Sequence, residues 1–466
     1  MSNYLFKFIS SDCGSGKTQQ LINLMKKTTD NYIVVQGTKS LCAQTHEELD
    51  GLAKIITSNQ YNNVYNSVIE FLLNPTHRVL IITDTTFLQI KDTTILKNWK
   101  IYLDDVVTFH QFRNVHTEQK ELVEEHLFHS YEAIGDNHVT ALPITDFDDE
   151  VIRGAASVFK FVNRYDHFLF NAGFFEKVGA TNEYKRNKDQ LQVMAWVNLD
   201  RFAGLDITFM ANDFENTLVY LASPDSFVQT TLPLRERAVP LNERMKVFYF
   251  SEVPLTASFR ENSPEQFEKV LQWVDENLNE YIYTVNIAVN DKMKSGLIPN
   301  MSKGSYVAPQ SRGSNAFMNF NKAVWLASMK PSQVEAKQCE LMFNLSFSQL
   351  LQAREKEELY QFIQRSNLRD YDSDEVVEVY VFDKDQALSL SSTPVFIDLK
   401  IERTNSNKSP STFTALNMSE KEKSAFKRVK TFATKEAFDK WMSKPAQAAM
   451  KDALKEHFTN KWISLQ

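Results

Sequence analysis

A glycine-rich segment near the start of the chain has the composition of a phosphate-binding loop. It runs from Ser11 through Asp12, Cys13, Gly14, Ser15, Gly16 and Lys17 to Thr18. The glycines let the backbone curl so that its N–H groups point at one anion, and a helix behind the loop directs its positive end at the same point. Lys17 would neutralise the outer phosphates of a nucleotide, and Thr18 would give its hydroxyl to magnesium. The alternative is an ordinary glycine turn before a helix.

Two adjacent aspartates, Asp104 and Asp105, follow the apolar run from Ile101 to Leu103. A nucleotide-hydrolysing site needs one carboxylate for magnesium and a second acid to activate the attacking water, both at the end of a buried strand. We therefore expect Asp104 to contact the metal and Asp105 to activate the water. The alternative is a capped turn, in which paired aspartates are common.

Short apolar runs that alternate with helical patterns must position these residues. The spacing predicts strands over Tyr4–Ile9, Tyr32–Val35, Val79–Ile82 and Ile101–Leu103, and a second series over Val247–Phe250, Tyr281–Val289, Ala323–Leu326 and Val376–Phe382. A helix with Ser263 as N-cap and Pro264 at its first position follows the first strand of the second series. Strands alternating with helices indicate parallel sheets covered on both faces, so the sequence predicts two α/β units in tandem.

The predicted units have a long insertion and a tail. The first unit is expected over residues 1–235, with an inserted subdomain at about 111–205, a stretch too long for a simple loop. The second is expected over 236–400, and a mainly helical region over 401–466. From Lys400 to the end there are 14 Lys and Arg against 7 Asp and Glu, so the tail is the basic part of the chain. We expect the insertion to form a wedge or a clamp on a bound strand.

Composition restricts the class of protein. The formal net charge of −7 means that any nucleic-acid binding must come from local grooves. No run reaches the roughly 18 apolar residues of a membrane span, and no secretory signal is evident, so we expect no membrane partner and a cytoplasmic location. In the tail, Lys421, Lys423, Lys427, Arg428 and Lys430 could contact nucleic acid, while Phe426, Phe432, Trp441 and Trp462 fit the core of a small helical domain.

Six elements in order resemble the motifs of superfamily 2 (DExD/H-like) helicases. The loop from Ser11 resembles AxxGxGKT, Gly37 to Gln44 resembles PTRxLxxQ, and Asp104 to Val107 resembles the DExx box; Met210 to Asn212 is similar to the SAT-like motif, Arg312 to Asn315 to motif V, and Gln361 to Arg369 to the QxxGRxxR of motif VI. The compact size and divergent motifs are similar to helicases encoded by bacteriophages. The series covers residues 11–369.

The resemblance implies two RecA-like domains with ATP and Mg²⁺ in the cleft between them and a single strand across their tops. On this basis Gln361 positions water, and Arg365 and Arg369 stabilise charge on the γ phosphate. The residues it assigns to the nucleotide are Ser11, Gly14, Ser15, Gly16, Lys17, Thr18 and Gly313. Those it assigns to nucleic-acid phosphates or to sensing the nucleotide state are Thr38, Lys39, Thr83, Ser314 and Asn315.

Three departures qualify these assignments. Asp105 stands where the family has glutamate, Gln364 replaces a glycine, and the second arginine comes one residue late, so either Arg365 or Arg369 could be the arginine finger. The sequence predicts a monomeric ATP-dependent helicase or translocase. It would act on single-stranded or forked DNA during phage replication or recombination, with other replication proteins as partners, in the cytoplasm of the host cell. An RNA helicase, a remodelling translocase that does not unwind, and a nucleotide-gated switch protein are the alternatives.

Overall fold

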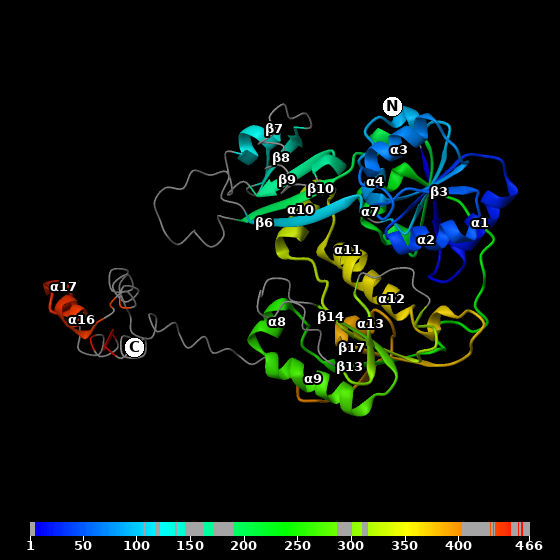
Figure 1. Cartoon of the computed structure of the whole chain (residues 1–466). Helices are drawn as coiled ribbons and strands as arrows, with labels where there is room; N and C mark the ends of the chain where they lie inside the picture. Colours follow the sequence, from blue (N-terminus) through cyan, green and yellow to red (C-terminus); the bar gives the residue numbers. More distant parts are fainter. Residues whose placement is uncertain are drawn as a thin grey trace. The chain divides into compact units, whose positions relative to one another are not determined.

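The structure is a computed structural model of the whole chain (Figure 1). It describes residues 5–106, 108–116, 122–135, 138–144, 162–171, 190–286, 301–309, 316–402, 429, 432, 434–448, 455 and 458–459. The chain divides into two compact units, one of Met1–Ala257 with Lys269–Lys400 and one of Ser258–Glu268 with Ile401–Gln466. Each unit is described by itself.

The first domain contains a seven-stranded sheet with the strand order β12-β1-β11-β5-β2-β4-β3. Its strands are β1 (Phe6–Ser10), β2 (Tyr32–Gln36), β3 (Ala53–Ile55), β4 (Val79–Thr83), β5 (Lys100–Asp104), β11 (Asp206–Ala211) and β12 (Phe227–Gln229). All neighbouring strands pair in parallel. Every residue of β2 is buried, as expected for a parallel sheet covered on both faces. The carboxyl ends of the strands, and hence the loops that follow them, lie along one edge.

Helices cover the two faces of this sheet. They are α1 (Lys17–Lys27), α2 (Lys39–Glu48), α3 (Val64–Leu73), and the short α4 (Asp84–Phe87) and α7 (Leu218–Ala222). Leu21 and Ile22 of α1 share one buried cluster with Cys42 of α2, whereas Val68 and Phe71 of α3 belong to another. The helices α1 and α2 therefore pack on the opposite face from α3.

The second domain contains a six-stranded parallel sheet with the order β15-β14-β16-β17-β13-β18. Its strands are β13 (Met245–Ser251), β14 (Tyr281–Val285), β15 (Gly304–Tyr306), β16 (Lys322–Leu326), β17 (Val377–Asp383) and β18 (Val395–Phe396). The helices in this part of the sequence are α8 (Ala257–Asn262), α9 (Pro264–Asn277), α10 (Gln333–Phe343), α11 (Phe347–Leu351), α12 (Glu357–Ile363) and α13 (Lys384–Leu388). A π-helical segment, Gln352–Lys356, joins α11 to α12. The prediction of two tandem parallel-sheet domains of the RecA-like class is confirmed.

The insertion forms a five-stranded antiparallel sheet with the order β6-β10-β9-β8-β7. Its strands are β6 (His110–His116), β7 (Phe128–Ile134), β8 (His138–Pro143), β9 (His167–Asn171) and β10 (Gln190–Trp196). Successive side chains of a strand point to opposite faces. Accordingly, Phe168 and Phe170 join the core of the first domain, while Leu169 joins a cluster with Cys339 and Leu350 of the second domain. Figure 1 shows α10 beside β10, so the inserted sheet contacts both domains.

The second unit contains the described part of the tail, with α16 (Lys435–Met442) and α17 (Pro445–Ala448). Phe438, Trp441 and Phe458 are buried there, and the rings of Trp441 and Phe432 are 5.0 Å apart. Phe432 and Trp441 therefore belong to an aromatic core, as expected, whereas Phe426 and Trp462 lie outside the described residues. The five basic residues from Lys421 to Lys430 lie outside the described residues, and the exact domain boundaries remain a prediction. None of the helices that the structure describes is long and apolar enough to span a membrane.

Candidate nucleotide site

The glycine-rich loop connects β1 to α1 at the carboxyl edge of the first sheet. The Ser11 N–H donates to the carbonyl oxygen of Ala211 on β11 at 3.1 Å, and this hydrogen bond holds the start of the loop against the sheet. Gly14 and Gly16 have φ angles of 80° and 89°, the left-handed region that residues with a Cβ rarely adopt. α1 begins at Lys17 with Gly16 as its N-cap and with no side-chain capping bond. Its first N–H groups are therefore directed into the loop, where an anion would accept them.

The loop lies against a segment of the second domain. A Cβ added to Gly14 would be 3.0 Å from the carbonyl oxygen of Arg369 and 3.0 Å from the ring of Tyr371. Because one of these atoms is backbone, the contact leaves little room for any side chain at this position. Gly14 is thus required both for its φ angle and for the approach of the two domains.

Lys17, Thr18 and Asp104 converge below the loop. The Lys17 ammonium donates to the carbonyls of Ser11 at 2.6 Å and Asp12 at 3.1 Å, and the Thr18 hydroxyl donates to Asp104 Oδ2 at 2.8 Å. The amide of Gln36, a residue that the sequence did not single out, donates to the same oxygen at 2.9 Å. Burial, together with the neighbouring charge of Asp105, raises the pKa of Asp104.

This set of oxygen atoms fits a magnesium ion. Mg²⁺ prefers hard oxygen ligands and takes only one or two protein carboxylates, with waters and nucleotide phosphates at its other positions. The Thr18 hydroxyl and the Asp104 carboxylate already lie within hydrogen-bonding distance of one another. A dication between them would also offset the burial that disfavours the charged carboxylate.

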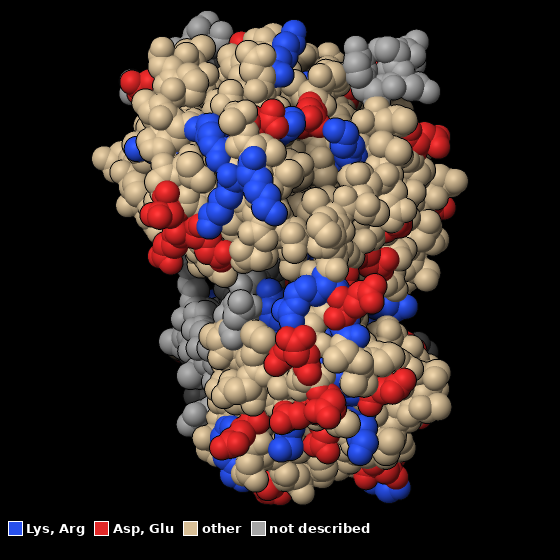
Figure 2. Space-filling view, turned by 90° about the vertical axis from the view of Figure 1, so that its right-hand side faces the viewer, with Lys and Arg blue, Asp and Glu red and all other residues tan. Residues whose placement is uncertain are grey.

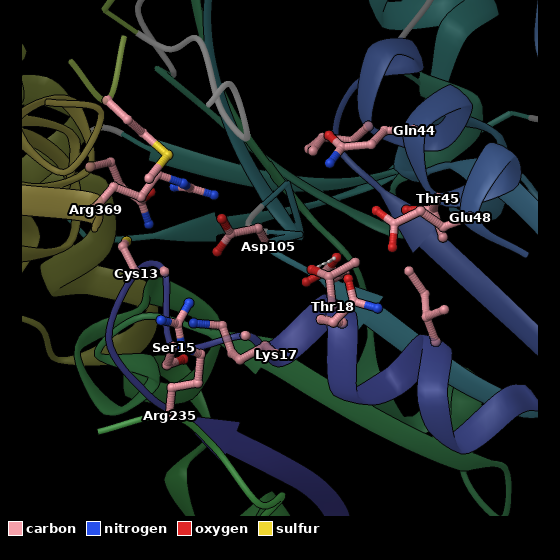
Figure 3. A pocket seen from close by; sticks show the side chains of 18 residues that line it. Cys13, Ser15, Lys17, Thr18, Gln44, Thr45, Glu48, Asp105, Arg235 and Arg369 are labelled. Carbon is pink, nitrogen blue, oxygen red and sulfur yellow. Dashed lines mark hydrogen bonds between the residues drawn. The ribbon is translucent and has the colours of Figure 1, made fainter. Parts of the chain in front are cut away.

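Asp105 has an unusual backbone conformation. Its φ angle is 57°, and its N–H donates to the carbonyl of Met210 on β11 at 2.8 Å. Aspartate is one of the few residues that tolerate the left-handed region, which explains why the chain can turn here directly after β5. Figure 3 shows the Asp105 carboxylate in the cavity, between Arg369 on one side and Thr18 on the other.

The cavity itself is formed by both domains and has a volume of ≈ 240 Å³. The first domain contributes the loop, Asp104, Asp105 and part of α2, and the second contributes Met318, Gln361 and Arg369. Arg235, from the segment between the domains, also lines it. Anion-binding backbone, two carboxylates and two arginines therefore face one space, which suits a polyphosphate with a metal ion.

The structure separates the two arginines of the sequence motif. Arg369 lines the cavity, whereas Arg365 is not among its lining residues and is 2% exposed. Gln361 lines the cavity, and its amide donates to Glu357 Oε1 at 2.8 Å. Gln364, at the position of the family glycine, is fully buried and its side-chain oxygen accepts from Arg237 at 2.9 Å. Arg369 therefore faces the cavity, whereas Arg365 is packed in the interior of the second domain.

Arg237, which the sequence analysis did not identify, links the phosphate loop to the second domain. Its guanidinium donates to Asp12 Oδ2 at 2.9 Å and to the carbonyls of Cys13 and Leu368. It also lies 3.9 Å from the ring centroid of Tyr371, whose hydroxyl donates to the carbonyl of Cys13 at 3.0 Å. The chain segments involved are far apart in sequence, so no local motif marks them.

Tyr360 completes this contact from α12. Its hydroxyl donates to the second carboxylate oxygen of Asp12. Burial, followed by the charge of Asp12, raises the pKa of Tyr360, so the phenol remains a neutral donor. Asp12 is therefore bound through both oxygens, and the loop is held to the second domain by hydrogen bonds as well as by packing.

The residues predicted to contact nucleic acid lie at the carboxyl ends of β2 and β4, outside this cavity. Thr38 caps α2 by accepting from Leu41 N–H, the exposed Lys39 donates to Asn59 at 3.2 Å, and Thr83 is the N-cap of α4. They share an edge of the sheet with the phosphate loop but have local structural contacts as well. Gly313, Ser314 and Asn315, with Arg312, lie outside the described residues.

Comparisons with known proteins add similarity of structure but not of sequence. No known protein family matches the chain, and no curated protein matches it. Among solved structures, it is similar to an apo form of XPD (10% identity, 85% of this chain, 97% of that chain, TM-score 0.49), to Xpd4 of S. tokodaii (11%, 90%, 95%, 0.44) and to Dbp5 of S. cerevisiae bound to RNA and ADP BeF3 (11%, 85%, 85%, 0.39). These values are too low to carry an argument about activity, so the proposal below depends on the site.

Proposed function

We propose that this protein is an ATP-hydrolysing motor that translocates on nucleic acid and separates the strands of DNA. The observation that carries the proposal is the composite cavity, in which the loop, Asp104 and Asp105 of one domain face Gln361 and Arg369 of the other. Hydrolysis in such a site requires both domains, so closing and opening of the cleft can be coupled to each turnover.

The residues have separate roles in this proposal. Lys17 and the loop N–H groups bind the phosphates, while Thr18 and Asp104 would hold magnesium, whose positive charge would offset the negative charge of the phosphoryl oxygens. Asp105 accepts the proton of the attacking water, Gln361 orients that water, and Arg369 stabilises the charge that develops on the γ phosphate. Arg235, beside Gly16, is placed to contact the same polyphosphate.

The finer parts of the proposal are the DNA substrate, a role in phage replication or recombination, and a cytoplasmic, monomeric protein. They rest on the sequence resemblance. On the face drawn in Figure 2, Lys and Arg side chains lie among Asp and Glu side chains. The surface that binds nucleic-acid phosphates in this proposal is therefore a limited positively charged region and not a whole face, in agreement with the net charge of −7.

The test is ATP turnover with and without single-stranded DNA or single-stranded RNA, for the wild-type chain and Lys17→Ala. We expect stimulation by DNA, and loss of turnover in Lys17→Ala with little change in melting temperature, because the Lys17 ammonium donates to two carbonyls of its own loop, Ser11 and Asp12. Stimulation by RNA alone would favour an RNA helicase, and stimulation without strand separation would favour a remodelling translocase. ATP binding without turnover would favour a nucleotide-gated switch. Turnover that persists in Lys17→Ala would show that the loop is not the ATP site.

A further inference from the structure

A second cavity, of ≈ 370 Å³, lies beside the nucleotide cavity. Most of its lining comes from β6 of the inserted sheet, the segment after β11 from Asp213 to Leu218, and the helical run from Gln352 to Glu358, and Thr108 and Met329 complete it. It is therefore a meeting point of the insertion, the first domain and the second domain. The residues that line the nucleotide cavity form a separate set.

Glu357 forms part of the wall between the two cavities. It lines the second cavity, while Gln361, one helical turn later on α12, lines the nucleotide cavity. The Gln361 amide donates to Glu357 Oε1 at 2.8 Å, and the Asn212 amide donates to Glu357 Oε2 at 2.8 Å. The Glu357 carboxylate therefore connects Asn212 of the first domain to Gln361 of the second domain, which lines the nucleotide cavity.

Asn212 extends this connection to the paired aspartates. It is buried and follows β11 directly, two residues after Met210, whose carbonyl holds the N–H of Asp105. A displacement of Glu357 thus reaches the nucleotide cavity along two routes, through the side chain of Gln361 and through the backbone that supports Asp105. Hydrogen-bonded contacts of this kind can transmit a change between neighbouring sites.

The wall of the second cavity suits a single strand of nucleic acid. Arg113 on β6 is exposed. The guanidinium of Arg354 lies 5.6 Å from the ring centroid of Phe112 and pairs with Glu335 at 2.9 Å, so it is held in place beside the ring. Arginines and aromatic rings along a groove bind phosphates and bases of single strands. Three carboxylates also line the cavity. That of Asp213 accepts two hydrogen bonds from Asn216 and that of Glu357 accepts from two amides, which reduces their repulsion of phosphates. The third, Glu358, is only 8% exposed.

We propose that Glu357 is a positioning residue that couples a single strand in the second cavity to ATP turnover in the first. This inference rests on the proposed function. When the single strand of nucleic acid contacts the wall of the second cavity, Glu357 moves with α12. This movement brings Gln361 and Asn212 into the arrangement that supports hydrolysis.

The test begins with Glu357→Gln, measured as the ratio of ATP turnover with single-stranded DNA to turnover without it. Both oxygens of Glu357 accept from side-chain amides. A glutamine there removes the negative charge to which both amides donate, and it presents an NH₂ to one of them, which must turn its own amide to accept. We expect the ratio to fall about tenfold, the size expected for losing one hydrogen bond to a charged group. The loss should appear in kcat more than in the KM for ATP. The matched control is Glu340→Gln on α10, a 60% exposed side chain outside both cavities, which should keep the wild-type ratio.

A reciprocal change distinguishes coupling from a structural role. In the double variant Glu357→Gln with Asn212→Asp, the aspartate accepts from the glutamine NH₂, and the glutamine oxygen accepts from Gln361. Both hydrogen bonds are restored with one reversed, so we expect the ratio to recover. A ratio that stays low in the double variant, or never falls in Glu357→Gln, would overturn the inference while the proposed function stands. A wild-type chain that hydrolyses ATP but responds to no polymer would overturn both.

Discussion

Arg365 and Arg369, the two arginines that follow α12, should respond to substitution in opposite ways. Arg369 lines the nucleotide cavity, and Arg365 is 2% exposed and outside it. If Arg369 stabilises the transferring phosphoryl group, Arg369→Ala removes an interaction made in the transition state. We expect kcat to fall by about 10³-fold or more, with nucleotide affinity nearly unchanged. Because Arg369 is only partly buried, its stability loss should be within about 1 kcal/mol.

Arg365→Ala should instead destabilise the fold. The substitution deletes two buried methylenes, which contribute about 0.8 kcal/mol each. It also removes a buried charged donor, whose loss costs about 1–3 kcal/mol. Together these give about 3–5 kcal/mol of lost stability. At a temperature where the variant remains folded, we expect kcat within about threefold of wild type.

Steady-state ATP turnover and thermal melting on the same preparations test both expectations. Arg365→Met is the control for packing, because it keeps most of the apolar volume and removes only the guanidinium. We expect it to be more stable than Arg365→Ala and similarly active. The assignment would be refuted if Arg365→Met lost turnover by orders of magnitude while Arg369→Ala remained active.

Two further predictions concern Asp105 and His110. Asp105→Asn should keep the left-handed turn, which asparagine also tolerates, but lose the proton acceptor. Turnover should therefore fall by about 10²-fold or more while ATP affinity is retained. A single-turnover rate equal to that of the wild type would exclude Asp105 as the acceptor. Burial lowers the pKa of His110 to about 3, so the folded state favours the neutral ring. The stability that depends on the neutral ring is therefore present above the unfolded pKa of about 6.5 and is lost as the pH falls. At pH 5 this loss is at most about 2 kcal/mol. His110→Gln should therefore flatten the decline in unfolding free energy between pH 6.5 and 5. If urea unfolding at each pH showed a decline as steep as in the wild type, the assignment to His110 would be contradicted.

Much of the fold was predictable because periodicity reports it directly. The eight strands predicted for the two parallel sheets lie within about two residues of the observed strands at most ends, since buried parallel strands are short runs of apolar residues. The sequence did not predict the other five strands of these sheets, which are β3, β11, β12, β15 and β18. β14 is the clearest difference. The apolar run suggested a strand to Val289, but the strand ends at Val285. The antiparallel sheet in the insertion was predicted only as a subdomain, because its strands alternate apolar with polar and aromatic residues and the sequence between them is long.

The candidate site was predictable only where its residues are consecutive. The loop from Ser11 to Thr18 and the pair Asp104 and Asp105 are local patterns with a direct chemical reason. Gln36 and Glu357, by contrast, acquire their contacts only when distant elements meet. The same holds for the two arginines, because their spacing alone left Arg365 and Arg369 as alternatives. The turn after α12 directs Arg365 into the interior and Arg369 toward the cavity, and this turn has no strong sequence signal.

The contacts that hold this site together are concentrated on α12. Tyr360 reaches Asp12 of the phosphate loop, Gln361 faces the nucleotide cavity, and Glu357 accepts from Asn212 at the end of β11. A rigid helix cannot shift one of these side chains without shifting the others. The inserted sheet adds a constraint, since Leu169 is buried with Leu350 of α11, which continues into α12 through the π-helical segment. The insertion, the phosphate loop and the turn after β11 therefore all contact one continuous helical run, so a displacement of this run would shift contacts at the insertion as well as at the nucleotide cavity.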